Sequence, residues 1–314
     1  MQVGLSADQA QQLGFWRELC PGLTIEGNAA PPRPALGDLE RHNALLRREG
    51  YINVPGVLAE EFIAPLRVCV ERLHTSQIPL AFAFVYDEFW RAFHALAPLL
   101  AAVLGKGYRA LPDFWVWHVL PSEKANGWGP HRDRIQPTLE PDNSPHTLTV
   151  WLPLTDATPL NGCIYVLPAH LDERFKLRRW DGDGNIAVKD PQNIRALPAP
   201  SGSMLAWNQA VLHWGGRASS LAGGPRSSIA FEFQRGDKDA FNEPLLDPVE
   251  LPPFQRRLGL IGKQVLQYEH MYPLPAEIAA IARTLRTRFM PEQPATKAAA
   301  DPLAGVEWES GGGG

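Results

Sequence analysis

The chain has 314 residues, a formal net charge of −4 and 45% hydrophobic residues. This length and apolar content suffice for a hydrophobic core that needs no disulfide or structural metal to hold it together. The mildly acidic balance gives no reason to expect nucleic acid or an anionic membrane as a partner.

The cysteines and the N-terminal segment bear on location. Cys20, Cys69 and Cys163 are widely spaced and odd in number, so they predict neither a disulfide framework nor a paired-cysteine metal motif. The N-terminal segment lacks the basic start and apolar stretch of a secretory signal. No apolar run approaches the roughly 18 residues of a membrane-spanning helix. We therefore expect a cytoplasmic protein.

Helical patterns come first along the chain. Residues 1–48 predict a short helical start and then a Pro-, Ala- and Gly-rich loop over Asn28–Gly37. Apolar side chains then recur with the spacing of one helix face over Ala59–His74 and again over Glu88–Leu104. We expect an amphipathic helix over each of these two segments.

Short strands are predicted from about residue 111 to residue 236. Turn residues such as Asn161-Gly162 and the segment 181–184 separate them. Many short strands between turn clusters are typical of an antiparallel sandwich or barrel. The predicted strands are Phe114–Leu120, Thr147–Leu154, Cys163–Leu167, Ser203–Trp207 and Ser228–Gln234.

These elements predict one domain over residues 49–290, preceded by the helical and loop extension of residues 1–48. A further helix is expected over Ala276–Phe289, after a proline-rich connection. Residues 291–314 are rich in Pro, Ala and Gly and end in four glycines. We expect this last segment to be a disordered tail.

The first chemical motif is His131-Arg132-Asp133. On an extended segment residues i and i+2 point to one face, so His131 and Asp133 are expected to converge while Arg132 turns away. An imidazole nitrogen and a carboxylate oxygen supply two of the three ligands of the facial triad that holds non-haem Fe(II). Arg132 and Arg134, which flank Asp133, are expected to be solvated, and contact with an anionic substrate is the alternative.

His213 is the candidate for the third ligand. It follows the predicted strand Ser203–Trp207 and precedes Gly215-Gly216, a pair that permits close backbone approach. The long interval after His131 leaves room for strands that return the chain across a barrel. The alternative is a core histidine packed beside an aromatic ring.

Arg226 and Ser228 form a candidate anion site. Alternation along the strand places them on one face, opposite Ile229, Phe231 and Phe233. An arginine fork beside a hydroxyl suits bidentate capture of a carboxylate. Arg226 on a surface salt bridge is the alternative for this residue, and Arg217 is a second candidate for the carboxylate.

With these residues in place, the chain resembles the phytanoyl-CoA dioxygenase family of iron- and 2-oxoglutarate-dependent oxygenases. The resemblance runs from about Glu49 to Gln234. Besides the candidate triad and Arg226, it rests on the segments Gly50–Leu58, Leu148–Leu154 and Asn161–His170, which are similar to the family's opening strand and central strands.

The resemblance implies a mainly β fold with flanking helices, built on a double-stranded β-helix (jelly-roll, cupin-like) core. It implies Fe(II) held by His131, Asp133 and His213, with 2-oxoglutarate and O2 as co-substrates and Arg226 on the distal carboxylate of 2-oxoglutarate. Many family members carry a serine two residues after the distal histidine, where this chain has Gly215. Ser228 is expected to take its place.

Further residues are assigned within the implied barrel. Thr149 and Trp151 share a face opposite Leu148, Val150 and Leu152, and they are candidates to contact 2-oxoglutarate. Trp115 and Trp117 also share a face and are assigned either to the core or to the wall of the pocket.

The implied activity is that of an oxidoreductase: hydroxylation of an unactivated C–H bond in a small molecule, coupled to conversion of 2-oxoglutarate to succinate and CO2. Halogenating relatives have a small residue at the position of Asp133, so its carboxylate favours oxygen insertion or desaturation. The alternatives are desaturation or another oxidative rearrangement in natural-product biosynthesis, and a non-catalytic metal-binding jelly-roll. The loops that select the substrate leave its class open.

Overall fold

The computed structural model describes residues 4–27, 30–122, 127–134, 138–176, 191–269 and 274–290. Within them, eight strands form two antiparallel sheets, one of five strands in the order β1-β6-β3-β8-β2 and one of three in the order β5-β4-β7. The strands are β1 (Tyr51–Val54), β2 (Arg109–Val119), β3 (Thr147–Pro153), β4 (Ile164–Leu167), β5 (Arg195–Leu197), β6 (Met204–Asn208), β7 (Leu212–Gly215) and β8 (Arg226–Gln234).

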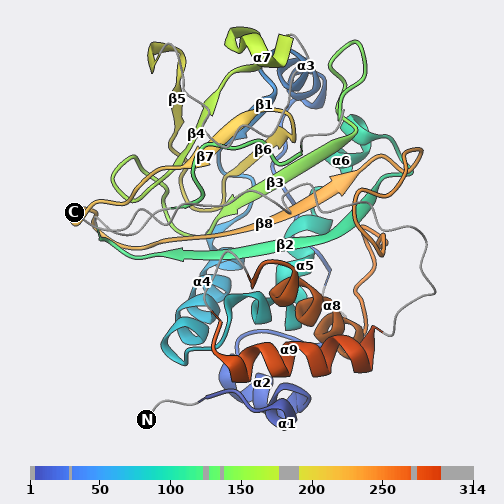
Figure 1. Ribbon diagram of the computed structural model, residues 1–314. Helices are drawn as coiled ribbons and strands as arrows, with labels where there is room; N and C mark the ends of the chain where they lie inside the picture. The colour runs from blue at the N-terminus through green and yellow to red at the C-terminus, as the bar shows by residue number, and fades with distance from the viewer. Residues whose placement is uncertain are drawn as a thin grey trace.

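Helices cover one face of the larger sheet. Figure 1 shows α4, α5, α8 and α9 packed below it, with α1 and α2 beyond α9, and the smaller sheet on the opposite side. No helix among the described residues is both long and apolar enough to cross a bilayer. The helices are α1 (Ala7–Ala10), α2 (Leu13–Leu19), α3 (Leu39–Glu49), α4 (Glu60–Thr75), α5 (Asp87–His94), α6 (Ala97–Leu104), α7 (Glu173–Lys176), α8 (Phe254–Gln267) and α9 (Ala276–Phe289).

The five predicted strands and the helices over 59–74 and 276–289 are confirmed within a few residues. The single helix predicted over Glu88–Leu104 is wrong, because the chain breaks at Ala95 and Leu96 into α5 and α6. Pro98 lies in the first turn of α6, where its missing N–H is tolerated, whereas it would interrupt a continuous helix. The turn predicted at 181–184 and the tail 291–314 lie outside the described residues.

Helix α8 was not predicted. It occupies part of the connection that the prolines marked as loop, and it follows Pro252 and Pro253, with Pro253 as its N-cap residue. Proline is common at the start of a helix because its fixed φ suits the first turn. The helix buries Leu258, Ile261 and Val265 against the rest of the core.

The alternation along β3 and β8 sorts side chains between two cores. Leu148, Val150 and Leu152 lie in the cluster between the larger sheet and the helices, as do Ile229, Phe231 and Phe233. Trp151 and Ala230 lie in the second cluster, on the other face of the sheet. The predicted two faces are therefore confirmed, and the polar face of β8 points away from the helices.

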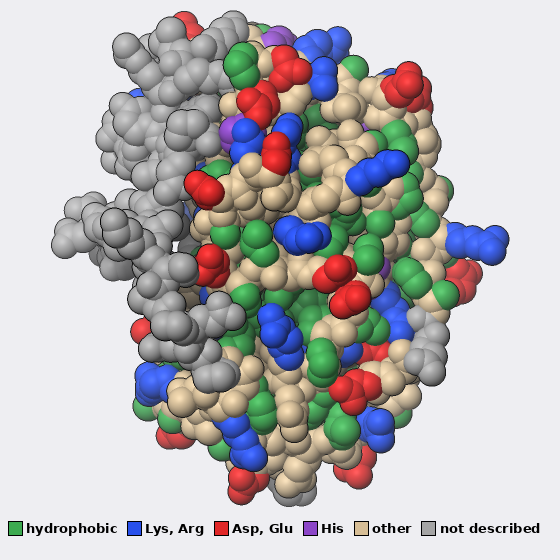
Figure 2. Space-filling model, turned by 90° about the vertical axis from the view of Figure 1, so that its right-hand side faces the viewer, with side chains coloured by type: hydrophobic (Ala, Val, Ile, Leu, Met, Phe, Trp, Pro, Cys, Tyr) green, Lys and Arg blue, Asp and Glu red, His purple; other side chains and the backbone are tan. Residues whose placement is uncertain are grey.

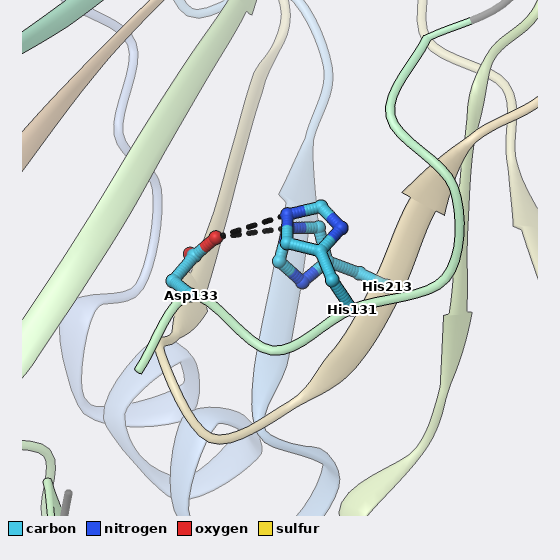
Figure 3. Close-up of side chains that lie close together, drawn as sticks. All are labelled: His131, Asp133 and His213. Carbon is cyan, nitrogen blue, oxygen red and sulfur yellow. Dashed lines mark ion pairs between the residues drawn. The ribbon is translucent and has the colours of Figure 1, made fainter. Parts of the chain in front are cut away.

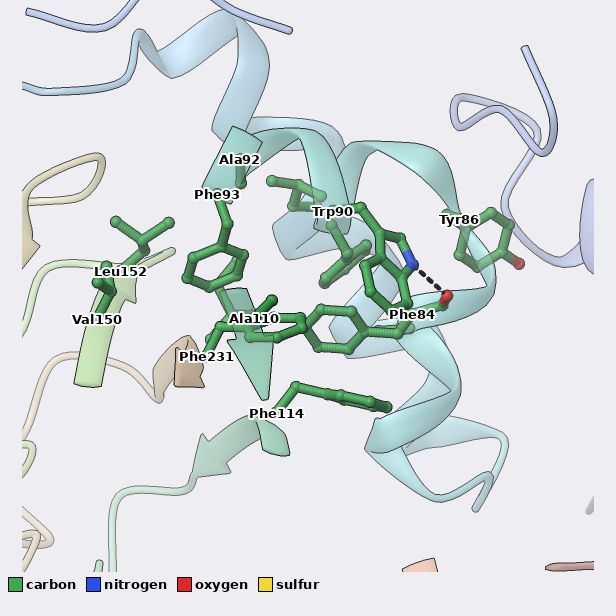
Figure 4. Close-up of a cluster of buried hydrophobic side chains, with 14 of the residues drawn as sticks. Phe84, Tyr86, Trp90, Ala92, Phe93, Ala110, Phe114, Val150, Leu152 and Phe231 are labelled. Atoms are coloured by element: carbon green, nitrogen blue, oxygen red, sulfur yellow. Dashed lines mark hydrogen bonds between the residues drawn. The ribbon is translucent and has the colours of Figure 1, made fainter. Parts of the chain in front are cut away.

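An aromatic cluster joins the larger sheet to the helices below it (Figure 4). The ring of Phe231 has its centroid 5.3 Å from Phe93, 5.6 Å from Trp90, 5.7 Å from Phe114 and 5.8 Å from Phe84. Trp90 also donates its indole N–H to the carbonyl of Phe84 at 2.8 Å. This cluster holds β8, and therefore Arg226, against a fixed layer.

Truncation of Phe231 to alanine is expected to lower the free energy of unfolding by about 3–5 kcal/mol, because it removes a buried ring and leaves a cavity. Urea denaturation followed by tryptophan fluorescence measures this change. Leu221, which is 80% exposed, supplies the control Leu221→Ala, expected to change stability by less than about 0.5 kcal/mol. A loss below about 1 kcal/mol for Phe231→Ala would contradict a fixed aromatic core.

The surface carries mixed charge. On the face seen in Figure 2, acidic and basic side chains are interspersed among apolar ones. This agrees with the small net charge of −4.

Candidate metal centre

Two backbone segments bring the candidate ligands together. His131 and His213 form an antiparallel bridge, in which each N–H donates to the other residue's carbonyl at 3.0 Å. His213 lies on β7 of the smaller sheet, so this bridge ties the loop that carries His131 to that sheet. The two imidazole rings consequently lie 4.4 Å apart.

The hydrogen bonds of the imidazoles define their tautomers. Nδ1 of His131 lies 2.7 Å from the carbonyl of Gly129, and Nδ1 of His213 lies 3.0 Å from that of Val211. A carbonyl only accepts, so both Nδ1 atoms carry the proton. Both Nε2 atoms are then turned toward Oδ1 of Asp133, at 3.4 Å from His131 and 3.3 Å from His213 (Figure 3).

Asp133 is fixed through its other oxygen. Oδ2 accepts hydrogen bonds from the Thr149 hydroxyl at 2.7 Å and from the Trp207 indole N–H at 2.9 Å. Burial acts to raise the pKa of Asp133, but the adjacent His213 and His131 imidazoles hold it well below its ordinary value. The carboxylate is therefore ionised, with Oδ1 directed at the two histidines.

The donor set fits a divalent metal ion. One ligand atom from each of the three residues lies within 4.8 Å of the others. The two Nε2 atoms and Oδ1 of Asp133 can each offer a lone pair to a cation placed between them. Two nitrogens and one carboxylate oxygen form the set typical of non-haem Fe(II) sites with open positions.

The same cavity contains Arg226. A cavity of about 60 Å³ is lined by the three candidate ligands together with Arg226, Trp151 and other residues of the larger sheet. Arg226 is only 2% exposed, and it donates from Nη1 to the hydroxyl of Ser228 at 2.9 Å. Its guanidinium carbon lies 5.8 Å from the centroid of the Trp151 ring. Arg217, the other candidate for the carboxylate, is exposed.

Gly215 occupies the position where the family often has serine, and the structure explains why this chain has none. A Cβ atom on Gly215 would lie 3.1 Å from the Cα of Gly127 and 3.7 Å from Nη2 of Arg226. The first of these contacts is too tight for a side chain unless the backbone at Gly127 moves. The hydroxyl that contacts Arg226 comes instead from Ser228.

Thr149 lines the cavity, but its hydroxyl donates its hydrogen bond to Asp133. Its contact with 2-oxoglutarate stays a prediction, as does that of Trp151. Trp115 and Trp117, for which core and pocket wall were both open, lie in the cavity wall. Trp128 packs edge-on against both rings, with centroids 5.8 Å and 5.3 Å away.

The expectation that the two flanking arginines are solvated is wrong. Arg132 is buried and pairs with Asp172 at 2.7 Å, while it also donates to the carbonyl of Ala210. Arg134 pairs with Glu232 at 2.7 Å and lies 3.7 Å from Asp113. Buried acidic partners lie far away along the chain, so the local sequence gave no sign of them.

Sequence reasoning also missed Trp207, Gln209 and Glu232. Glu232 lines the cavity, and burial raises its pKa to about 8 against the opposing charge of Arg134. The alternation of β8 could have revealed Glu232, because it shares a face with Arg226 and Ser228. Trp207 and Gln209 could be found only from strand pairing, in which Trp207 lies opposite Thr149.

Comparisons with known proteins indicate the class of protein to which the chain is similar. The model of the phytanoyl-CoA dioxygenase (PhyH) family matches residues 79–227. The chain matches none of the curated proteins compared with it. Among solved structures, it is similar to the non-heme monooxygenase ThoJ in its apo form, with a TM-score of 0.52 and 16% identity over 79% of this chain and 100% of that chain.

Two further solved structures show a weaker likeness. The non-heme alpha ketoglutarate-dependent epimerase SnoN from nogalamycin biosynthesis has a TM-score of 0.49 and 22% identity over 68% of this chain and 94% of that chain. AviO1 from Streptomyces viridochromogenes Tue57 has a TM-score of 0.47 and 20% identity over 67% of this chain and 99% of that chain. The similarity to ThoJ supports a common fold, and at this identity it supports nothing beyond the fold.

The family match, taken with a cavity that holds two histidines, one aspartate and a buried arginine, defines a non-haem iron oxygenase. The segment 79–227 belongs to the phytanoyl-CoA dioxygenase family, which confirms the resemblance inferred from the sequence. The chain is accordingly an oxidoreductase whose cofactor is Fe(II) and whose co-substrates are 2-oxoglutarate and O2.

Proposed function

We propose that this dioxygenase hydroxylates an unactivated C–H bond of a small molecule, with iron held by His131, Asp133 and His213 and with 2-oxoglutarate anchored by Arg226 and Ser228. The observation that carries the proposal is the presence of the three ligand atoms and the buried Arg226 in one cavity. A protein that only bound metal would have no use for a buried guanidinium there.

The cofactors supply the oxidising chemistry: oxidative decarboxylation of 2-oxoglutarate to succinate and CO2, coupled to attack on a C–H bond. The protein binds and orients the cofactors and the substrate, and it excludes water. The two Nδ1–H···O=C bonds hold each imidazole with Nε2 turned inward, and Thr149 and Trp207 hold Asp133. These partners fix the ligands before the metal arrives.

Arg226 suits the distal carboxylate of a dicarboxylic acid. Its planar fork can donate two parallel hydrogen bonds, and burial strengthens them because water does not compete. The Ser228 hydroxyl holds Nη1 of the Arg226 guanidinium in place by accepting its hydrogen bond. Thr149 and Trp151 remain candidates for further contacts with 2-oxoglutarate.

The aromatic wall favours a small-molecule substrate. Trp115, Trp117 and Trp128 line the cavity that contains the candidate ligands. The Trp128 and His131 rings meet edge-on, with their centroids 5.3 Å apart. Such rings exclude water and present flat apolar surfaces. The carboxylate of Asp133 favours hydroxylation or desaturation over halogenation, and hydroxylation is the simplest outcome.

We also propose that the two sheets form a jelly-roll (double-stranded β-helix) core. Their antiparallel pairing and the His131–His213 bridge support this arrangement. The proposal keeps the cytoplasmic location expected from the number and spacing of the cysteines.

The test is a visible spectrum of the anaerobic protein after addition of Fe(II) and then 2-oxoglutarate. A weak charge-transfer band and a lilac colour are expected, followed by succinate release in air. His213→Ala should abolish the band. His170→Ala, which removes a histidine that pairs with Glu49 outside the centre, should retain it.

Two other outcomes would change the assignment. Iron binding without a band would contradict the 2-oxoglutarate site and favour a cupin-type metal enzyme. Absence of iron binding would show that the three residues do not form a metal centre.

A further inference from the structure

A chain of hydrogen bonds runs from Arg134 to the carboxylate ligand. Nε of Arg134 donates to Oε1 of Gln209 at 2.9 Å. Nε2 of Gln209 donates to the Thr149 hydroxyl at 3.3 Å. The Thr149 hydroxyl donates to Oδ2 of Asp133 at 2.7 Å. We call Arg134, Gln209 and Thr149 the carboxylate relay.

Chemistry fixes the direction of every bond in the carboxylate relay. A guanidinium can only donate, so the amide of Gln209 must turn its oxygen to Arg134 and its NH2 to Thr149. Thr149 then accepts at its oxygen, and its single proton is left for Asp133. Donors therefore point one way along the relay, from a cation toward the carboxylate.

Burial makes this order costly to break. Gln209 is fully buried and Thr149 nearly so, and Glu232 and Asp113 at the Arg134 end are buried as well. Away from water, each polar group of the carboxylate relay can satisfy its hydrogen bonds only with its partner in the relay. The sheet sets the spacing, since Thr149 of β3 lies opposite Trp207 of β6 and Glu232 of β8.

We propose that Thr149 and Gln209 are positioning residues for the metal centre. Through them, Arg134 keeps the Thr149 hydroxyl donating its hydrogen bond to Oδ2 of Asp133. Oδ1 of Asp133 is thereby kept available for the metal. The inference rests on the proposed function, because it assigns Asp133 as an iron ligand. It adds two residues and a direction to that assignment.

The test is an anaerobic titration of the full-length protein with Fe(II), repeated with Co(II) as a redox-stable probe. Loss of a partner that orients a metal ligand typically weakens metal affinity by about 10- to 100-fold, and Thr149→Val is expected to fall in this range. Thr149→Ser, which keeps the hydroxyl, should recover affinity to within about threefold. Gln209→Met should weaken binding less than Thr149→Val, because the Thr149 hydroxyl remains but is free to rotate.

Thr147→Val is the matched control. Thr147 lies two residues earlier on the same strand and face, and its buried hydroxyl makes no hydrogen bond within the described part of the chain. This variant should bind both metals as the unchanged protein does. Thermal unfolding of each metal-free variant checks that it folds. Thr149→Val tests the hydrogen bond to Asp133, and Gln209→Met tests the link to Arg134.

Two readouts separate positioning from packing. Removal of the donor from Oδ2 leaves Asp133 more electron-rich, so the charge-transfer band with Fe(II) and 2-oxoglutarate should move to lower energy in Thr149→Val and stay in place in Thr147→Val. The double variant Thr149→Val/Gln209→Met should bind metal no more weakly than Thr149→Val, because both changes interrupt the same carboxylate relay.

The outcomes are distinct. If the unchanged protein binds iron and Thr149→Val behaves like Thr147→Val, or if the double variant shows additive losses, the relay is overturned and the proposed function stands. If Gln209→Met has no effect, Thr149 acts alone and the relay is again overturned. If the unchanged protein binds no metal, the proposed function fails and this inference fails with it.

Discussion

Replacement of Asp133 by asparagine is expected to eliminate 2-oxoglutarate turnover and to weaken Fe(II) binding by more than about 100-fold, beyond the range for an outer partner of a ligand. The variant should still fold, because the amide has the same size and its oxygen can accept from Thr149 and Trp207 as Oδ2 does. What it loses is the negative oxygen that faces the two imidazoles. Isothermal titration under nitrogen and succinate release measure the two effects.

The control for this change is Asp142→Asn, which neutralises a carboxylate that is largely exposed and pairs with Arg47 at the surface. It should leave both Fe(II) affinity and turnover unchanged, since exposed ion pairs contribute little. Retained iron affinity and turnover in Asp133→Asn would falsify the assignment of Asp133 as a ligand. A large loss in Asp142→Asn would point to a general loss of structure instead.

Arg226→Leu is expected to weaken 2-oxoglutarate binding by about 30- to 4,000-fold and to leave Fe(II) affinity within about threefold. Removal of one partner of a buried, hydrogen-bonded charge pair costs about 2–5 kcal/mol, and each 1.4 kcal/mol is about a factor of ten in affinity. The loss should be large because Arg226 is 2% exposed and water cannot replace it. The dependence of the charge-transfer band on 2-oxoglutarate concentration measures this affinity.

Arg217→Leu is the matched control, because Arg217 is an exposed arginine four residues after His213. It should bind 2-oxoglutarate as the unchanged protein does. Arg226→Lys should recover only part of the affinity, since an ammonium cannot make the two parallel bonds of the fork. The reverse result, with Arg217→Leu impaired and Arg226→Leu intact, would move the anion site to Arg217.

Much of the fold near the site follows from local sequence. The period-two pattern of β3 and β8 predicts which side chains face the helices and which face the cavity, because the pleat sends neighbours to opposite faces whatever the partner strands are. The same rule places Arg226 beside Ser228 on β8. His131 and Asp133 also converge, although only an isolated bridge at His131 and no strand includes them. Helix ends were less predictable: Pro98 divides a segment whose apolar spacing alone predicted one helix.

Long-range pairing decided the rest. The bridge between His131 and His213 and the opposition of Thr149 to Trp207 join segments far apart in the chain, and no local pattern encodes the register between them. Arg134 shows the physical reason most clearly. Its sequence neighbours predict a solvated side chain, yet it is bonded to Gln209, which directly follows β6, and to Glu232 on β8, and Gln209 connects it to the carboxylate of Asp133. The sequence alone determined which residues could bind iron, and the tertiary structure decided which groups hold them, because hydrogen-bond partners are assigned by packing and not by spacing along the chain.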